Sequence, residues 1–182
     1  MDKELIEISK FLSLILRHRP EIIDVKLDAE GWLEIDLLLR NARKIGKKLT
    51  LEQVHRTVSE NDKQRFALSK DGLRIRANQG HSLRSVRLKL SAQEPPEMLF
   101  HGTVPCFLNA IKEQGLIRRS RNHVHLSRNQ STAIKVAQRR GNPVVLEISS
   151  RVMFLAGYEF FLSENQVWLT EQVPPEYITF PE

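Results

Sequence analysis

A polar, proline-rich segment at residues 91–97 separates two halves of this chain that differ in sequence pattern. Pro95 and Pro96 make such a segment a short, semi-rigid linker. A chain of 182 residues suits one large domain or two small ones. The linker favours two, so we expect one domain over residues 1–92 and a second over residues 93–182.

The first half shows three helical patterns. Apolar residues at helical spacing predict helices over residues 5–16, 35–45 and 51–61. Pro20 and Gly46 are stop signals after the first two helices. Thr50 and Gln53 form the pattern of a capping box at the start of the third.

A hairpin pattern follows these helices. Two short strands, residues 65–69 and 73–76, flank a Lys-Asp-Gly turn. Three short helices followed by a β-hairpin describe a winged helix, an architecture common among nucleic-acid-binding proteins. This is an analogy of fold, so it favours nucleic-acid binding and says nothing about chemistry.

The second half alternates strands and helices. Strands are predicted at residues 98–101, 123–126, 143–148, 158–162 and 167–170, and helices at residues 104–113 and 130–140. Many short strands with two helices predict a mixed lobe, and the whole chain is therefore expected to be of the α+β class.

The net charge of +6 is confined to the first half. Residues 1–92 contain 19 Lys and Arg against 13 Asp and Glu, whereas residues 93–182 contain 9 of each kind. A basic half joined to a neutral half indicates that one lobe meets a polyanion. A well-solvated surface rich in Lys and Arg is the alternative that charge alone leaves open.

Composition excludes several classes of protein. The longest apolar runs, such as residues 11–16, fall far short of the roughly 20 residues of a membrane span. The start of the chain lacks the apolar run of a signal peptide. Cys106 is the only cysteine, which rules out an intramolecular disulfide and a thiolate metal cluster, and its apolar neighbours predict a buried structural residue. We expect a cytoplasmic monomer without membrane association or an obligate protein partner.

Familiar nucleotide and metal motifs do not occur. The sequence contains neither Gly-x-Gly-x-x-Gly nor Gly-x-x-x-x-Gly-Lys, so a Rossmann fingerprint and a P-loop are excluded. His123 and His125 are two residues apart without an evident third ligand, so we expect no metal site.

The remaining candidates are Arg and His residues, which suit phosphate chemistry because Arg binds phosphate bidentately and His moves protons near neutral pH. Arg17, His18 and Arg19 end the first helix, where cations also simply complement the helix dipole. Arg65 begins the hairpin, and a solvated strand residue is its alternative reading. A further segment places donors around a flexible glycine and looks like a phosphate-contacting loop; its candidate RNA-binding residues are Arg76, Gln79, Gly80, His81 and Ser82.

Eight motifs in series resemble one family over nearly the whole chain. They are Leu-Arg-His-Arg-Pro (16–20), Asp-Ala-Glu-Gly-Trp-Leu-Glu-Ile-Asp (28–36), Lys-Gln-Arg-Phe (63–66), Ile-Arg-Ala-Asn-Gln-Gly-His-Ser (75–82), Phe-His-Gly-Thr (100–103), His-Val-His-Leu-Ser (123–127), Arg-Arg-Gly-Asn-Pro-Val-Val-Leu (139–146) and Asn-Gln-Val-Trp-Leu-Thr (165–170). In this order they are similar to the RNA 2'-phosphotransferases, a family that includes the enzymes that finish tRNA splicing in eukaryotes.

The resemblance implies a winged-helix RNA lobe followed by an NAD lobe related to the ADP-ribosyltransferases. It implies that the RNA 2'-phosphate attacks the nicotinamide-bearing ribose carbon of NAD, which expels nicotinamide and leaves ADP-ribosylated RNA. The neighbouring 2''-hydroxyl then attacks the phosphate, releasing RNA with a 2'-OH and ADP-ribose 1'',2''-cyclic phosphate. NAD is the co-substrate and no metal is implied, because Arg and His supply the positive charge.

The resemblance also implies the site residues. The catalytic set falls on Arg17, His18, Arg65 and Arg139, with the first three gripping the 2'-phosphate and Arg139 acting in the second step. The NAD-contacting residues fall on His101, Gly102, Thr103, His125, Leu126, Ser127 and Asn165. Arg140 is adjacent to Arg139, and periodicity does not separate them. Gln166 occupies a position where the family motif has Gly, which weakens the expectation of a tight turn beside Asn165.

Two other functions remain open at this point. An ADP-ribosyltransferase that caps phosphorylated nucleic-acid ends would need the same residues for its single step. A winged-helix regulator with a ligand-sensing second domain would explain the basic half, but would leave Arg139 and the segment 101–103 without a role. The sequence does not indicate the physiological RNA.

Overall fold

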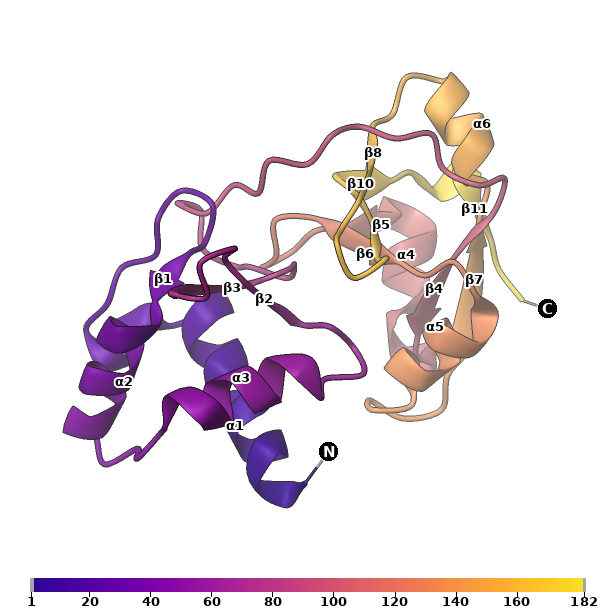
Figure 1. Ribbon diagram of the computed structural model, residues 1–182. Coiled ribbons are helices and arrows are strands. Elements are labelled where there is room, and N and C mark those ends of the chain that lie inside the picture. Colours follow the sequence, from indigo (N-terminus) through magenta and orange to yellow (C-terminus); the bar gives the residue numbers. More distant parts are fainter. Residues whose placement is uncertain (1, 182) are drawn as a thin grey trace. The chain divides into compact units, whose positions relative to one another are not determined.

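The computed structural model describes residues 2–181 of the chain, which form two compact units with their sequence boundary between Lys89 and Leu90 (Figure 1). Both units combine helices with small antiparallel sheets, and the described residues include six α-helices. The predicted α+β class is therefore confirmed. None of these helices is both long enough and apolar enough to cross a membrane.

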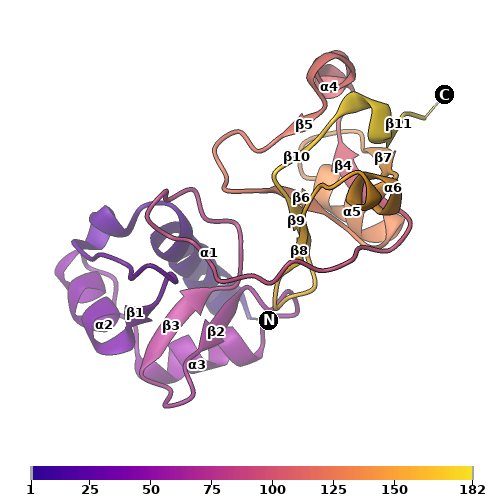
Figure 2. The same cartoon turned by 90° about the horizontal axis from the view of Figure 1, so that it is seen from above.

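The first unit contains three α-helices and one sheet. Its elements are α1 (Lys3–Arg17), β1 (Leu33–Glu34), α2 (Ile35–Lys44), α3 (Leu51–Ser59), β2 (Phe66–Leu68) and β3 (Arg74–Ala77). The strands pair antiparallel in the order β1-β3-β2 (Figure 2). The three helices and the hairpin predicted for this half are confirmed, and β1 is an additional strand that its two residues were too few to indicate.

Local sequence explains where these elements begin and end. The Thr50 hydroxyl accepts a hydrogen bond from the Gln53 N–H at 3.2 Å, and the Gln53 side chain accepts one from the Thr50 N–H at 2.9 Å, so the capping box is confirmed. Pro20 begins a short 3-10 turn instead of extending α1. In the hairpin turn, Gly72 adopts a φ of +72°, which favours glycine.

The core of the first unit lies between the helices and one face of the sheet. Leu12 and Leu16 of α1 and Leu38 of α2 are fully buried there. On the sheet, Leu33 and Ile75 face this core, because alternate residues of a strand point to opposite faces. The other face of the sheet is left to polar and partly exposed side chains.

The described residues of the second unit include eight short strands and three α-helices. Its elements are β4 (Leu99–Thr103), α4 (Leu108–Gln114), β5 (Leu116–Ile117), β6 (Val124–Leu126), α5 (Gln130–Ala137), β7 (Val144–Ile148), α6 (Ser150–Leu155), β8 (Phe160–Leu162), β9 (Trp168–Thr170), β10 (Gln172–Val173) and β11 (Ile178–Thr179). The antiparallel sheets have the orders β11-β7-β4, β6-β9-β8 and β10-β5. Helix α5 packs on β4 and β7 (Figure 1).

Most elements predicted for this half are present, with several differences. Helix α5 ends at Ala137, three residues before the predicted end, and α6 and the two-residue strands β5, β10 and β11 had no prediction. The prediction that Cys106 is buried is wrong: the thiol is exposed. The reason is a 3-10 turn at Pro105–Phe107 that precedes α4 and directs Phe107, rather than Cys106, toward the core.

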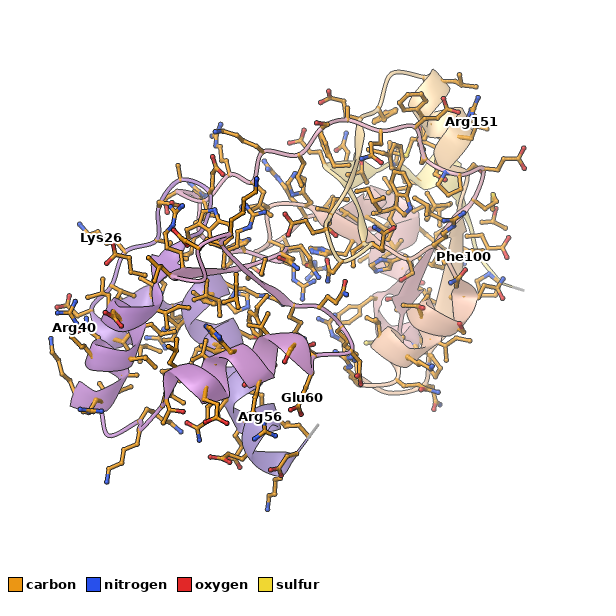
Figure 3. The ribbon with its side chains drawn as sticks, in the orientation of Figure 1. Lys26, Arg40, Arg56, Glu60, Phe100 and Arg151 are labelled. Atoms are coloured by element: carbon orange, nitrogen blue, oxygen red, sulfur yellow. The ribbon has the colours of Figure 1, made fainter. Side chains whose placement is uncertain are left out.

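The proline-rich linker is bound along its length to other residues of the second unit, of which it forms the first part. The Gln93 N–H donates to the Phe160 carbonyl at 2.8 Å, beside a bridge between Ala92 and Phe161. The Ser150 hydroxyl donates to the Pro96 carbonyl at 2.7 Å. Arg151 of α6, labelled in Figure 3, forms an ion pair with Glu94 of the linker.

Candidate functional site

In the first unit, the end of α1 meets the loop that follows β3. The Ser82 N–H donates to the Arg17 carbonyl at 2.9 Å, and the Ser82 hydroxyl is hydrogen-bonded to His18 Nδ1 at 3.0 Å. Arg17 Nη2 donates to the Arg65 carbonyl at 3.3 Å. Residues 65 apart in sequence are thus joined in one group, which we call the arginine–histidine cluster: Arg17, His18, Arg65, His81 and Ser82.

The hairpin and its following loop hold this cluster in place. The Asn78 N–H donates to the Arg65 carbonyl at 2.9 Å, and the Asn78 side chain donates to the Gln64 carbonyl at 2.7 Å. Gly80 adopts a φ of +87°, and a Cβ placed there would lie 3.5 Å from Arg17 Nη1. That distance is an ordinary van der Waals contact, so glycine is favoured here by its positive φ, which a residue with a side chain adopts only with strain.

His81 is the buried member of the cluster. The residue is 2% exposed, and within the described part of the chain its Nε2 atom has no hydrogen-bond partner. Burial, followed by the charges of Arg17, His18 and Arg76, lowers the pKa of His81 to about 4. The imidazole is therefore neutral at physiological pH, and it adds no positive charge to that of the neighbouring arginines.

This depressed pKa predicts a pH dependence of folding stability. In the unfolded chain His81 binds a proton with a pKa near 6.5, whereas in the folded protein it does so only near pH 4, so its contribution to stability is present above pH 6.5 and is lost as the pH falls toward 4. At pH 5 the loss is about 2 kcal/mol. Urea unfolding at pH 7 and pH 5 measures this loss. Between these two pH values the free energy of unfolding should fall by about 2 kcal/mol less in His81→Asn than in the wild type. Equal falls in the two proteins would contradict a neutral, buried His81.

In the second unit, the residues of two predicted motifs lie on adjacent strands. Phe100 of β4 and Ser127, just after β6, exchange two backbone hydrogen bonds of 2.8 Å. His101 Nδ1 lies 3.1 Å from the His125 carbonyl. Because a carbonyl can only accept, Nδ1 carries the proton, which leaves Nε2 as an acceptor in the neutral ring.

The charges of two arginines act on the pKa of this histidine. Burial lowers the pKa of His101, and the charges of Arg140 and Arg121 lower it further against the opposing effect of the His125 carbonyl. Burial and the charge of Arg140 also lower the pKa of Arg121. We call His101, His125, Ser127, Arg121 and Arg140 the His101 cluster.

Arg121 is a candidate that the sequence analysis did not identify. It lies in a run of three arginines, and the structure gives the other two different roles: Arg118 forms an ion pair of 3.3 Å with Glu171, and Arg119 lies over the Phe107 ring at 5.8 Å. The only signal for Arg121 in the sequence was its place in a group of basic residues shortly before His123. Arg139 is exposed beyond the end of α5, next to Arg140.

Gly102 and Thr103 complete β4 beside His101. A Cβ on Gly102 would lie 2.0 Å from the Ala133 carbonyl oxygen of α5. The space beside this glycine is filled by the helix, so the missing side chain serves the packing of α5 on β4. Thr103 is 6% exposed, and Leu126 is buried in the core.

Asn165 lies in the turn between β8 and β9. Its Oδ1 atom accepts a hydrogen bond of 2.9 Å from the Ser163 hydroxyl. The Gln166 N–H donates to the Ser163 carbonyl at 2.9 Å, and Gln166 adopts a φ of +60°. The tight turn thus forms although glutamine stands in the glycine position, because a single residue can occupy the left-handed region at a cost of about 1–2 kcal/mol.

The two clusters bring guanidinium and imidazole groups together, a combination that suits phosphorylated ligands: one joins Arg17 to His18 and His81, and the other places a neutral histidine near two cations. Comparison with known proteins is more specific. The chain belongs to the RNA 2'-phosphotransferase family: the sequence model of the family described as "RNA 2'-phosphotransferase, Tpt1 / KptA family" matches residues 3–172.

Individual relatives match over almost their full length. A probable RNA 2'-phosphotransferase of Rhodopirellula baltica is 58% identical over 180 residues, which covers 99% of this chain and 98% of the relative. A protein of the same description from Flavobacterium johnsoniae is 51% identical over 95% of this chain and 94% of its own length. One from Escherichia coli is 47% identical, with 99% and 93% covered.

Proposed function

We propose that this protein is an NAD-dependent RNA 2'-phosphotransferase: it transfers an internal 2'-phosphate of RNA to NAD through ADP-ribosylated RNA and releases 2'-OH RNA, nicotinamide and ADP-ribose 1'',2''-cyclic phosphate. The observation that carries the proposal is the arginine–histidine cluster, in which hydrogen bonds join the Arg17 guanidinium to the Arg65 backbone and His18 to Ser82 at the end of α1. Family membership and the names of the relatives support it.

The two units divide the work in this proposal. The first is an RNA-binding lobe of winged-helix type, supported by its three helices, its hairpin and its excess of basic residues. The second is an ADP-ribosyltransferase-like lobe that binds NAD. The His101 cluster supports this role, because a neutral imidazole acceptor suits a ribose hydroxyl and two guanidinium groups suit a pyrophosphate.

The residues of the first unit bind and orient the phosphate. A 2'-phosphate is already an anionic nucleophile, so it needs fixed donors more than a general base. Arg17 and Arg65 supply charge: the Arg17 guanidinium donates to the Arg65 carbonyl, and the carbonyls of both residues accept hydrogen bonds from the loop after β3. His18, held by Ser82, is placed to donate a hydrogen bond or a proton. Bound NAD supplies the electrophilic ribose carbon.

The decisive experiment uses a short RNA with one internal 2'-phosphate, incubated with and without NAD in the absence of metal. We expect ADP-ribose cyclic phosphate and 2'-OH RNA only when NAD is present. Nicotinamide release that stops at ADP-ribosylated RNA would favour the end-capping activity, and RNA binding without NAD consumption would favour the regulator.

One arginine of the second unit is proposed to complete the set in the second step. Arg139 is the candidate by resemblance, while Arg140 and Arg121 are the two arginines whose charges reach His101. Arg139→Ala, Arg140→Ala and Arg121→Ala should be compared in the same assay. The variant that accumulates ADP-ribosylated RNA identifies the residue, and normal turnover by Arg139→Ala would remove that assignment.

A further inference from the structure

The outer face of the β1-β3-β2 sheet carries a tryptophan between arginines. Leu33 pairs with Ile75 and Glu34 with Arg74, so the register places Trp32 opposite Arg76. Since Ile75 faces the core, Arg74, Arg76 and Trp32 lie on the other face. The Arg76 guanidinium lies 4.5 Å from the centre of the Trp32 ring, and that of Arg74 lies 5.6 Å from it.

The backbone before Trp32 is fixed by one side chain. Asp28 Oδ1 accepts hydrogen bonds from the Trp32 N–H at 2.8 Å and the Glu30 N–H at 2.9 Å. Asp28 Oδ2 lies 3.8 Å from Arg74 Nη1. The ring and both guanidinium groups are therefore arranged before any ligand binds, which reduces the entropy lost on binding.

This surface continues into the arginine–histidine cluster. The charge of Arg76 helps to lower the pKa of His81. In the sheet, Arg76 of β3 pairs with Ala67 of β2, and Ala67 lies two residues after Arg65. The carboxylates on this face, Asp28 and Glu34, lie at the Arg74 end. Positive charge therefore increases along the surface from Arg74 toward the proposed phosphate site.

We propose that Trp32, Arg74 and Arg76 form a platform that binds the RNA strand flanking the 2'-phosphorylated nucleotide; this rests on the proposed function of the arginine–histidine cluster. A base stacks on the Arg76–Trp32 pair, and the arginines contact the adjacent phosphates. Aromatic rings with neighbouring cations are the usual means of holding single-stranded nucleic acid without reading its sequence.

The test compares two ligands, a nucleoside 2'-phosphate and a single-stranded hexaribonucleotide with one internal 2'-phosphate. Isothermal titration calorimetry measures both affinities in every variant, including those that lack the Trp32 ring; in the wild type, where Trp168 is 7% exposed, quenching of fluorescence by RNA additionally reports on Trp32. We expect the wild type to prefer the hexanucleotide, and we expect Trp32→Leu and Arg74→Ala to reduce this preference roughly tenfold. Arg74→Ala should also lower the slope of log affinity against log salt by about 0.7.

Two controls separate a binding role from a structural one. Trp32→Phe keeps an aromatic face and should restore most of the preference. Arg56→Ala removes an exposed arginine that is paired with Glu60 at 3.0 Å on α3 (Figure 3), and it should bind both ligands like the wild type. Thermal unfolding checks that each variant is folded.

The outcomes distinguish the platform from the proposed function. If the wild type turns over both ligands but Trp32→Leu and Arg74→Ala keep its preference for the hexanucleotide, the platform is wrong and the function stands. If the wild type shows no preference between the ligands, the platform is equally excluded. If it binds neither ligand, both proposals fail.

Discussion

Replacing Arg17 by alanine is expected to lower kcat/KM for 2'-phosphate removal by a factor of about 10³. The substitution removes a guanidinium from the proposed phosphate site and also removes one of the donors to the Arg65 carbonyl. The loss should fall on kcat as well as KM, because charge stabilisation grows as phosphoryl transfer proceeds. Arg17→Lys keeps the charge without the planar fork and should recover only part of the activity.

Arg19 provides the matched control. It lies two residues away, is exposed and forms an ion pair of 3.0 Å with Glu21, so Arg19→Ala should retain activity within about threefold. Single-turnover rates with the 2'-phosphorylated RNA and NAD measure the chemical step in both variants, and thermal unfolding confirms that they are folded. Similar rates for the two variants would exclude Arg17 from the phosphate site.

Replacing Gly102 by alanine is expected to lower the free energy of unfolding by about 4 kcal/mol, a large cost for one added methyl group. The new Cβ would lie 2.0 Å from the Ala133 carbonyl oxygen and 2.8 Å from its carbon, both of which are backbone atoms. A flexible side chain could rotate away, but backbone inside α5 cannot, so the helix must move off β4. Urea denaturation of the purified variant measures the loss.

Gly46 is the control for this prediction. It adopts a φ of +80° and has no atom within 4 Å of a built Cβ, so Gly46→Ala reports backbone strain alone, about 1 kcal/mol. Gly102 does not have a positive φ, and its cost must therefore come from the contact with α5. Equal destabilisation by the two substitutions would contradict the close packing of α5 on β4.

Local patterns were sufficient for α1 to α5 and insufficient for α6 and the smallest strands. Helix α1 follows from its apolar periodicity and α3 from the Thr50–Gln53 capping box, both of which are encoded by residues close in sequence. Strands β1, β5, β10 and β11 have two residues each. They exist only because a partner strand lies beside them, and a partner distant in sequence leaves no local pattern.

The same reasoning applies to the candidate sites. Arg17, His18 and the segment 76–82 became candidates because Arg and His suit phosphate chemistry and because their motifs resemble one family, and the hydrogen bond from the Ser82 N–H to the Arg17 carbonyl brings them together. Arg121 was missed, because its significance depends on Arg140 and His101, which lie elsewhere in the chain. Cys106 was misjudged because hydrophobic neighbours in sequence do not determine which side of a turn faces the core.

The pairing of the linker with β8 has a consequence for solubility. In the sheet order β6-β9-β8, β8 is an outer strand, and its sequence begins with Phe160 and Phe161. An outer strand of this kind offers unpaired N–H and C=O groups to other molecules and promotes aggregation. The backbone contacts of Gln93 and Ala92 with β8 cover part of that strand edge. The proline-rich linker therefore shields this sheet from edge-to-edge association with another molecule.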